Sequence, residues 1–216
     1  SDKLYNKQRH FVENAAHELQ TPLAVCMNKL ELLSEHPDCT EDQLKEIAGL
    51  HQALNGIIRL NKSLLLLSRI DNKQFPETRD ICLNHLIHKI LEGINDIYER
   101  KALHLRVSEK ESLVCTMNES LATTLITNLI KNAYVHNYEK GDIGITISRR
   151  MLTIANTGID KTLDKELLFA RFASQSKQQE STGLGLAIVK SIVDLYSIRI
   201  DYQYANGMHT FTLLFY

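Results

Sequence analysis

The chain has 216 residues, of which 44% are hydrophobic and 24% are charged, as in a globular protein with a sizeable core. Its net charge of -1 excludes a strongly basic surface for nucleic acid or for an anionic membrane. The four cysteines are far apart and form no C-x-x-C pair, which argues against a zinc site or disulfides and favours a reducing compartment. No apolar run of about 18 residues is present, so we expect membrane attachment only through segments absent from this chain.

The N-terminal part of the sequence predicts a helical hairpin. Apolar residues recur at three- and four-residue steps through residues 3–35, and the segment 36–39, which contains a proline, interrupts them. Thr40 and Gln43 then form the pattern of a capping box, which starts a second helix that runs to about residue 70 and has Asn61 in its apolar stripe. The combined stripe is too wide for one hairpin to bury, so we expect a homodimer that forms a four-helix bundle.

A second domain follows the polar, proline-containing segment 71–77, so we expect domains over residues 1–74 and 78–216. The expected strands lie near residue 81 and at 103–108, 113–117, 143–149, 152–155, 198–204 and 209–216. The expected helices lie at about 86–97, 119–137 and 183–196. This order predicts an α+β domain with a mixed, mostly antiparallel sheet and helices on one face.

One turn of the first helix carries several reactive groups. Glu18 follows His17 directly, Thr21 lies four residues after His17 on the same helix face, and Pro22 comes next. A proline inside a helix costs about 3 kcal/mol and kinks it, which invites a functional explanation. Taken alone, however, a His-Glu pair on a helix favours a surface helix with an incidental histidine.

Two asparagines share one face of the predicted helix at 119–137. Asn128 and Asn132 are four residues apart in an otherwise apolar stretch. Their amide oxygens can ligate a hard cation, and their NH₂ groups can donate to phosphate. By themselves they are equally well interpreted as polar residues of the solvent face.

Two further motifs point towards a nucleotide. Asn156 ends a predicted strand before Gly158, where its amide oxygen can accept from an adenine amine, although a simple turn residue is the alternative. The glycines in the segment 182–185 open a helix, so that backbone N–H groups can approach an anion closely. Neither a P-loop nor a dinucleotide fingerprint is present.

In this order the motifs resemble those of the cytoplasmic kinase core of a bacterial sensor histidine kinase. The H box, N box, G1 box, F box and G2 box correspond to residues 11–23, 128–137, 154–158, 168–172 and 182–189. The resemblance covers essentially the whole chain. It implies a helical-hairpin dimerisation and histidine phosphotransfer domain, followed by an α/β-sandwich ATP-binding domain of the gyrase, Hsp90 and histidine kinase type.

The resemblance also implies residue roles. His17 would attack the γ-phosphate of ATP, Glu18 would hold its Nδ1 and act as the base, and Thr21 would orient water for dephosphorylation of a regulator. Asn132, with Asn128, would hold Mg²⁺ and the triphosphate. Phe169 and Phe172 would anchor an ATP lid at about 173–181. The other nucleotide-binding residues would be Asn156, Gly158, Lys177, Thr182, Gly183, Leu184 and Gly185.

Three positions depart from the family pattern. Asn156 stands where the G1 box usually has an aspartate, and Ile159-Asp160 replaces its second glycine. Tyr134-Val135 replaces a basic residue of the N box, for which His136, Lys131 or Lys177 could compensate. These departures bear on nucleotide affinity, because an amide accepts a hydrogen bond without the charge of a carboxylate.

The predicted activity is that of an ATP-dependent protein-histidine kinase, which passes the phosphoryl group to an aspartate in the receiver domain of a response regulator and also dephosphorylates that regulator. The alternatives are a catalytically weak or inactive docking scaffold and an ATPase that uses water as acceptor; the His17 turn argues against the latter. The resemblance implies a cytoplasmic fragment of a protein in the bacterial inner membrane. Bending at Pro22 would let His17 move between the ATP-binding domain and a docked regulator.

Overall fold

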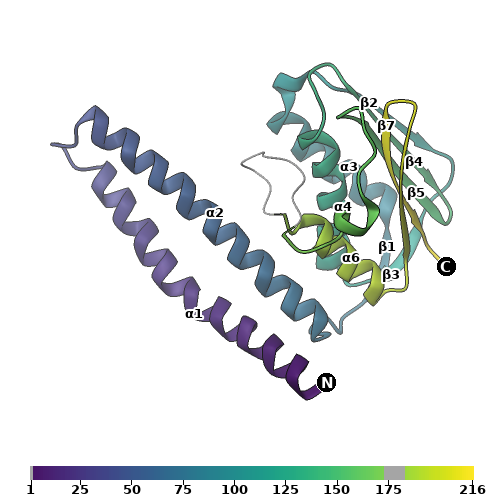
Figure 1. Cartoon of the computed structure of the whole chain (residues 1–216). Coiled ribbons are helices and arrows are strands. Elements are labelled where there is room, and N and C mark those ends of the chain that lie inside the picture. The colour runs from purple at the N-terminus through teal and green to yellow at the C-terminus, as the bar shows by residue number, and fades with distance from the viewer. Residues whose placement is uncertain (1, 173–182) are drawn as a thin grey trace. The chain divides into compact units, whose positions relative to one another are not determined.

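The structure of the protein is a computed structural model, which describes residues 2–172 and 183–216 (Figure 1). The chain divides into a helical unit that includes residues 2–74 and an α/β unit built from residues 75–172 and 185–216.

The helical unit is an antiparallel hairpin of α1 (Asp2–Ser34) and α2 (Glu41–Asp71), which lie side by side in Figure 1. The capping box is confirmed, because Gln43 N donates to Thr40 Oγ1 at 3.2 Å and Thr40 N donates to Gln43 Oε1 at 2.9 Å. The α1 helix continues through Pro22, which has no N–H to donate to the carbonyl of Glu18. Both predicted helices are therefore confirmed to within about two residues.

Part of the apolar surface of the hairpin is buried and much of it is exposed. Ala16, Leu67 and Ile70 are buried. The large apolar side chains of this unit that remain exposed are Phe11, Leu19, Val25, Leu32, Leu33, Leu44, Leu50 and Ile57. A hairpin with this much exposed apolar surface is not self-sufficient, as its sequence pattern predicted.

The α/β unit contains a five-stranded sheet in the order β2-β4-β5-β7-β6, in which β2 runs parallel to β4 and every other pair is antiparallel. Its strands are β2 (His104–Glu109), β4 (Asp142–Ser148), β5 (Met151–Thr157), β6 (Arg199–Ala205) and β7 (Met208–Leu214). One face is covered by three helices (Figure 1): α3 (Leu83–Ile97), α4 (Glu119–Val135) and α6 (Gly185–Leu195). The predicted mixed sheet with helices on one face is confirmed.

Four smaller elements complete the described part of this unit. β1 (Arg79–Cys82) and β3 (Val114–Met117) pair as a separate antiparallel sheet, which the sequence pattern did not separate from the main one. The 3-10 turn η1 (Glu99–Lys101) follows α3, and the short helix α5 (Lys165–Leu168) follows β5; neither was predicted, because one turn carries too little periodicity.

The core lies between the sheet and its helices. Alternate residues of β4, β5 and β7 are buried on the helix side, while the residues between them are half-buried or exposed. Each fully buried aliphatic side chain contributes roughly 1.5–3 kcal/mol of transfer free energy. The buried hydrophobic residues of these three strands on that face are Ile143, Ile145, Ile147, Leu152, Ile154, Phe211 and Leu213.

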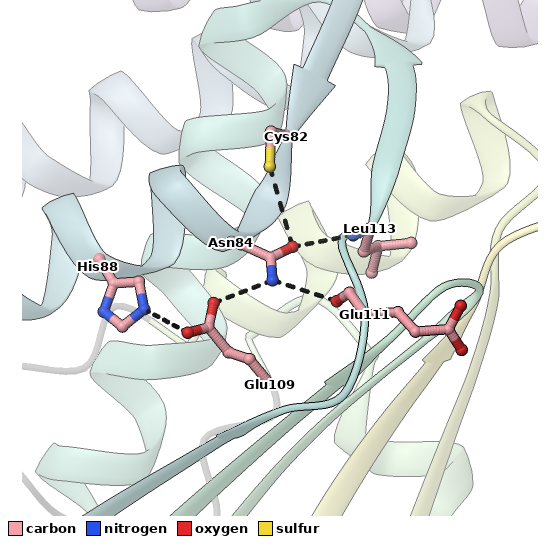
Figure 2. A network of polar contacts seen from close by, with 6 residues as sticks. All are labelled: Cys82, Asn84, His88, Glu109, Glu111 and Leu113. Carbon is pink, nitrogen blue, oxygen red and sulfur yellow. Dashed lines mark hydrogen bonds and ion pairs between the residues drawn. The ribbon is translucent and has the colours of Figure 1, made fainter.

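A polar network around buried Asn84 fastens the start of α3 to the end of β2 (Figure 2). Its Nδ2 donates to Glu109 Oε1 at 2.9 Å and to the carbonyl of Glu111 at 3.2 Å, and its Oδ1 accepts from Leu113 N at 2.8 Å. His88, one turn further along α3, contacts the other oxygen of Glu109 at 3.1 Å. These contacts lower the pKa of Glu109, first through His88 and then through Asn84.

Candidate functional site

Asn156 is the penultimate residue of the central strand β5, and its side-chain amide is buried. Its side chain lies on the helix-covered face, is 3% exposed, and is in register with Ile143 and His209 on the neighbouring strands. The amide Nδ2 donates to the carbonyl of Thr157 at 2.8 Å. No described residue donates to Oδ1. A buried acceptor without a donor costs about 1–3 kcal/mol, and the exocyclic amine of an adenine is a donor that would satisfy it.

The loop that follows Asn156 is held by two side chains of the β6–β7 hairpin. His209 is buried, and its Nε2 lies 2.7 Å from the carbonyl oxygen of Ile159 while its Nδ1 lies 2.7 Å from the hydroxyl of Tyr202. Leu163 N donates to that hydroxyl at 3.2 Å. Because a carbonyl only accepts, the neutral ring protonated at Nε2 satisfies every group: Nε2–H donates to Ile159, and Tyr202 donates to Nδ1.

The backbone of Gly158 lies close to the ring of His209. A Cβ at Gly158 would lie 3.0 Å from the carbonyl oxygen of His136 and 3.3 Å from His209 Cδ2, so a side chain fits there only if these neighbours move. Burial lowers the pKa of His136, and the nearby charge of Lys101 lowers it further. The lowered pKa favours the neutral imidazole. His136 therefore does not supply the positive charge that was expected of it as a substitute for the basic residue of the N box.

The two predicted asparagines of α4 are available to different degrees. Asn128 is half-buried and donates from Nδ2 to the Thr124 carbonyl of its own helix at 2.8 Å, which leaves its Oδ1 for a ligand. The side chain of Asn132 is half-buried and makes no hydrogen bond within the described part of the chain. Gly185 begins α6 beside this face, because a Cβ there would lie 3.0 Å from Asn128 Oδ1.

The C-terminal end of α4 is fixed by a lysine that the sequence did not single out. Lys101 Nζ donates to the carbonyls of Tyr134, Val135 and Asn137 at 2.8, 2.9 and 3.0 Å. An ammonium group at this end also compensates the negative end of the helix dipole. The helix that carries Asn132 is thus anchored one turn beyond that residue.

A second hydrogen-bond cluster joins this end of α4 to β4 and β5. Thr157 Oγ1 donates to Asn137 Oδ1 at 2.6 Å and accepts from Asp142 N at 2.8 Å, and Asn137 Nδ2 donates to the carbonyl of Asp142 at 3.0 Å. Gly141 leaves room for the cluster, since a Cβ there would lie 2.0 Å from Asn137 Oδ1. The cluster fixes the residue next to Asn156 on β5.

The glycine-rich segment enters α6 as the sequence predicted. Gly183 has φ of +70°, a backbone conformation that glycine adopts without strain, and Leu184 after it is buried. The α6 helix starts at Gly185, two residues later than predicted. Lys177 and Thr182 lie outside the described residues.

The two phenylalanines of the predicted lid anchor behave differently. The ring of Phe169 packs edge-on against Phe211 of the core, with centroids 6.3 Å apart. Phe172 is 61% exposed, so the packing expected for it is not found among the described residues. Within the described residues, the expected packing is therefore found for Phe169 and not for Phe172.

In the helical unit, His17, Glu18 and Thr21 are all exposed on α1. Within the described residues, none of the three side chains makes a hydrogen bond or an ion pair, so the expected contact between Glu18 and Nδ1 of His17 is not formed. Ala16 immediately before them is buried, and its carbonyl accepts from Asn61 Nδ2 of α2 at 2.8 Å. An exposed imidazole next to a fixed backbone is accessible to an incoming reactant.

The helical unit exposes a histidine, and the α/β unit has a buried amide acceptor on β5 and two asparagines on α4. These features fit the class of a phosphoacceptor domain joined to an ATPase-type domain. Residues 7–73 match the family model of the His Kinase A (phospho-acceptor) domain. Residues 117–215 match that of the Histidine kinase-, DNA gyrase B-, and HSP90-like ATPase. The chain therefore belongs to the sensor histidine kinases, as a kinase core in which these two domains follow one another.

Relatives and solved structures agree with this family. The chain is 33% identical over 223 residues to the heme sensor protein HssS of Staphylococcus saprophyticus, in a match that covers 99% of this chain and 47% of that protein. The chain thus spans about half the length of the curated relatives it matches.

Two solved structures share the fold. Full-length ShkA in complex with AMPPNP has a TM-score of 0.73 at 16% identity, over 96% of this chain and 46% of that one. The histidine kinase AdeS of Acinetobacter baumannii has a TM-score of 0.63 at 21% identity, over 91% of this chain and 95% of that one. Within the described residues, no helix has both the length and the apolar character needed to cross a bilayer.

Proposed function

We propose that the chain autophosphorylates His17 from ATP and passes the phosphoryl group to an aspartate in the receiver domain of a response regulator. The observation that carries the proposal is the buried Oδ1 of Asn156, which has no donor among the described residues and lies in a domain of the ATPase family. The exposure of His17 in the phosphoacceptor domain supports the assignment of this histidine as the acceptor.

Asn156 would recognise the adenine through its Oδ1, since the contact of its Nδ2 with Thr157 orients the amide and Oδ1 has no donor among the described residues. Gly158 would belong to the same site, because the absence of a side chain lets the turn after β5 pack closely against the carbonyl of His136 and the ring of His209. The start of α6 would receive the phosphates, because the N–H groups of the first turn of a helix and the helix dipole favour an anion. The residues that we propose for the phosphate side are Lys177, Thr182, Gly183, Leu184 and Gly185. The structure of ShkA is a complex with AMPPNP, which supports an adenine nucleotide as the ligand.

Mg²⁺ would be held with the triphosphate by the amide oxygens of Asn132 and Asn128. The two residues fit a hard cation, because Asn132 has no hydrogen-bond partner among the described residues and Asn128 retains a free Oδ1. When bound, Mg²⁺ supplies neutralisation of the phosphate charge.

In the chemical step, the lone pair of His17 Nε2 forms a bond to the γ-phosphorus while the bond from phosphorus to the bridging oxygen breaks, and ADP leaves with that electron pair. The carboxylate of Glu18 would accept the hydrogen bond of Nδ1–H and stabilise the positive charge that develops on the ring. In the second transfer, a carboxylate oxygen of the regulator attacks phosphorus, the N–P bond breaks and a neutral imidazole returns.

The partners follow from the same assignment. The exposed apolar side chains of the hairpin would be covered by a second copy, which gives a homodimeric four-helix bundle. Thr21, one turn after His17, would orient the water that dephosphorylates the regulator. We further infer that the longer protein is anchored in the bacterial inner membrane, with this chain on its cytoplasmic side.

Incubation with Mg²⁺ and γ-labelled ATP tests the proposal. We expect acid-labile, base-stable label on the wild type and none on His17→Gln. His10→Gln is the matched control, because His10 is also an exposed histidine of α1. Label that persists in His17→Gln would contradict the acceptor. A wild type that binds nucleotide but takes no label would favour the alternative of a docking scaffold without kinase activity.

A further inference from the structure

The α2 helix presents polar side chains to α1 at positions where an apolar residue would pack. Asn61 and Ser68 are buried, and their spacing of seven residues puts them on the same helix face. Between them, residues 64–67 are all leucine. Buried polar residues in a helix–helix seam cost stability compared with leucine, and their best-attested use is to specify one register of the helices.

Asn61 makes its contact with the main chain of α1. The side chain is 5% exposed, and its Nδ2 donates to the carbonyl of Ala16 at 2.8 Å. The small side chain of Ala16, itself buried, lets the amide reach that carbonyl. A hydrogen bond to a backbone atom fixes the helix itself, whereas a contact with a flexible side chain would not. The fixed residue directly precedes His17.

A carboxylate one turn earlier fixes α1 a second time. Glu13 Oε2 accepts from Asn72 Nδ2 at 2.9 Å and from Ser68 Oγ at 3.5 Å, and Glu13 Oε1 accepts from Gln74 Nε2 at 3.3 Å. Glu13 and Ala16 are three residues apart, so both contacts lie on the α2-facing side of α1. They connect this side of α1 to the C-terminal half of α2 and to the residues after it.

The helix is looser on the other side of His17. Pro22 has no N–H, so the carbonyl of Glu18 lacks the hydrogen bond that residue 22 of a regular helix would supply. The turn that carries His17 is therefore fastened to α2 at its start and weakened at its end.

We propose that Asn61 is a positioning residue for phosphoryl transfer: its bond to the Ala16 carbonyl sets the register of α1 on α2 and thereby the position of His17. The proposal rests on the proposed role of His17 as acceptor. A slip of one residue would rotate the histidine by about 100° around the helix, and a slip of one turn would shift it by about 5.4 Å. Displacements of even about 1 Å can lower the rate of an enzymatic reaction about 100-fold.

The test is Asn61→Leu in the full chain. We expect a melting temperature that is unchanged or raised, a kcat for autophosphorylation reduced at least tenfold, and a KM for ATP within twofold of the wild type. Asn55→Leu is the matched control, because Asn55 is a half-buried asparagine of the same helix that contacts His51 of α2 itself, at 3.0 Å. We expect its kcat to be unchanged. A normal kcat in Asn61→Leu would overturn the proposal.

Two further measurements keep the proposal falsifiable if Asn61→Leu folds poorly or the wild type takes no label. Asn61→Gln retains the donor and Asn61→Ala loses it, so we expect a higher kcat in the first; equal values would overturn the proposal. Amide hydrogen exchange of residues 16–21 needs no activity. We expect faster exchange there in Asn61→Leu but not in Asn55→Leu, and unchanged exchange would overturn the proposal even if His17 were not the acceptor.

Discussion

Asn156 donates its side-chain Nδ2 to the carbonyl of its neighbour Thr157 at 2.8 Å, and this contact decides which atom of the amide remains for a ligand. The contact uses one N–H of the NH₂ group and orients the amide, so that Oδ1 can accept a hydrogen bond, which no described residue supplies. The amide can thus act towards adenine as a carboxylate would, but without a charge in a buried position.

The first prediction concerns Asn156→Ala. Losing the acceptor would leave the adenine amine unpaired in a buried site, so we expect binding of a non-hydrolysable ATP analogue to weaken about tenfold, or about 1.4 kcal/mol. Isothermal titration calorimetry measures this change. Thr153→Ala is the control, because Thr153 is half-buried on the opposite face of the same strand. Equal affinities of the two variants would contradict the assignment of Asn156.

The second prediction is that Asn156→Asp lowers the stability of the folded protein. A carboxylate has no proton to donate to the Thr157 carbonyl 2.8 Å away, and it would be charged in a position that is 3% exposed. We expect a loss of about 1–3 kcal/mol in the free energy of unfolding. Chemical denaturation measures it. A variant as stable as the wild type would show that the Thr157 contact is unimportant.

The third prediction concerns the loop after Asn156. In Tyr202→Phe, the N–H of Leu163 loses its acceptor and Nδ1 of His209 loses its donor. We expect a loss of about 1–3 kcal/mol in stability, together with weaker nucleotide binding because the loop is released. Tyr216→Phe, at an exposed tyrosine, serves as the control in both assays. If nucleotide affinity stayed at the wild-type value, the loop would have no part in the site.

The fourth prediction compares two glycines of the same region. In Gly141→Ala, the added Cβ would lie 2.0 Å from Asn137 Oδ1 and 2.5 Å from Thr157 Oγ1, so the hydrogen-bond cluster must open. We expect a cost of about 2–4 kcal/mol by overpacking and loss of buried hydrogen bonds. A Cβ at Gly144 in β4 would meet nothing within 4 Å, so Gly144→Ala should be nearly neutral. Thermal unfolding of both variants shows whether Gly141→Ala costs more stability than Gly144→Ala.

The fifth prediction concerns stability in acid. The contacts with His88 and Asn84 lower the pKa of Glu109 in the folded state, so its charge stabilises the fold above the ordinary glutamate pKa of about 4.3 and this contribution is lost as the pH falls through the lowered value. We expect Glu109→Gln to be less stable than the wild type at pH 7 and to converge with it in acid. Melting temperatures between about pH 7 and pH 3 test this. Glu139→Gln, at an exposed glutamate, should run parallel to the wild type throughout.

The sequence by itself determined the elements and predicted the candidate site residues. Helical and strand periods depend on neighbours along the chain, so α1, α2 and the strands of the sheet were predictable to within about two residues. The motifs around His17, Asn132, Asn156 and Gly183 were readable because each needs a particular residue type at a particular spacing. The period even placed Asn61 in the buried stripe of α2.

The tertiary structure alone decided what those groups contact. Asn61 meets the Ala16 carbonyl 45 residues away, and His209 meets Ile159 50 residues away. A single polar residue looks the same in the sequence whether it is solvated or bonded to a distant backbone atom. Its partner is set by how the helices and strands pack, because a buried donor or acceptor must find one to avoid the cost of desolvation. The positions of the His17 turn and of the loop after Asn156 were therefore fixed by packing, which no local pattern records.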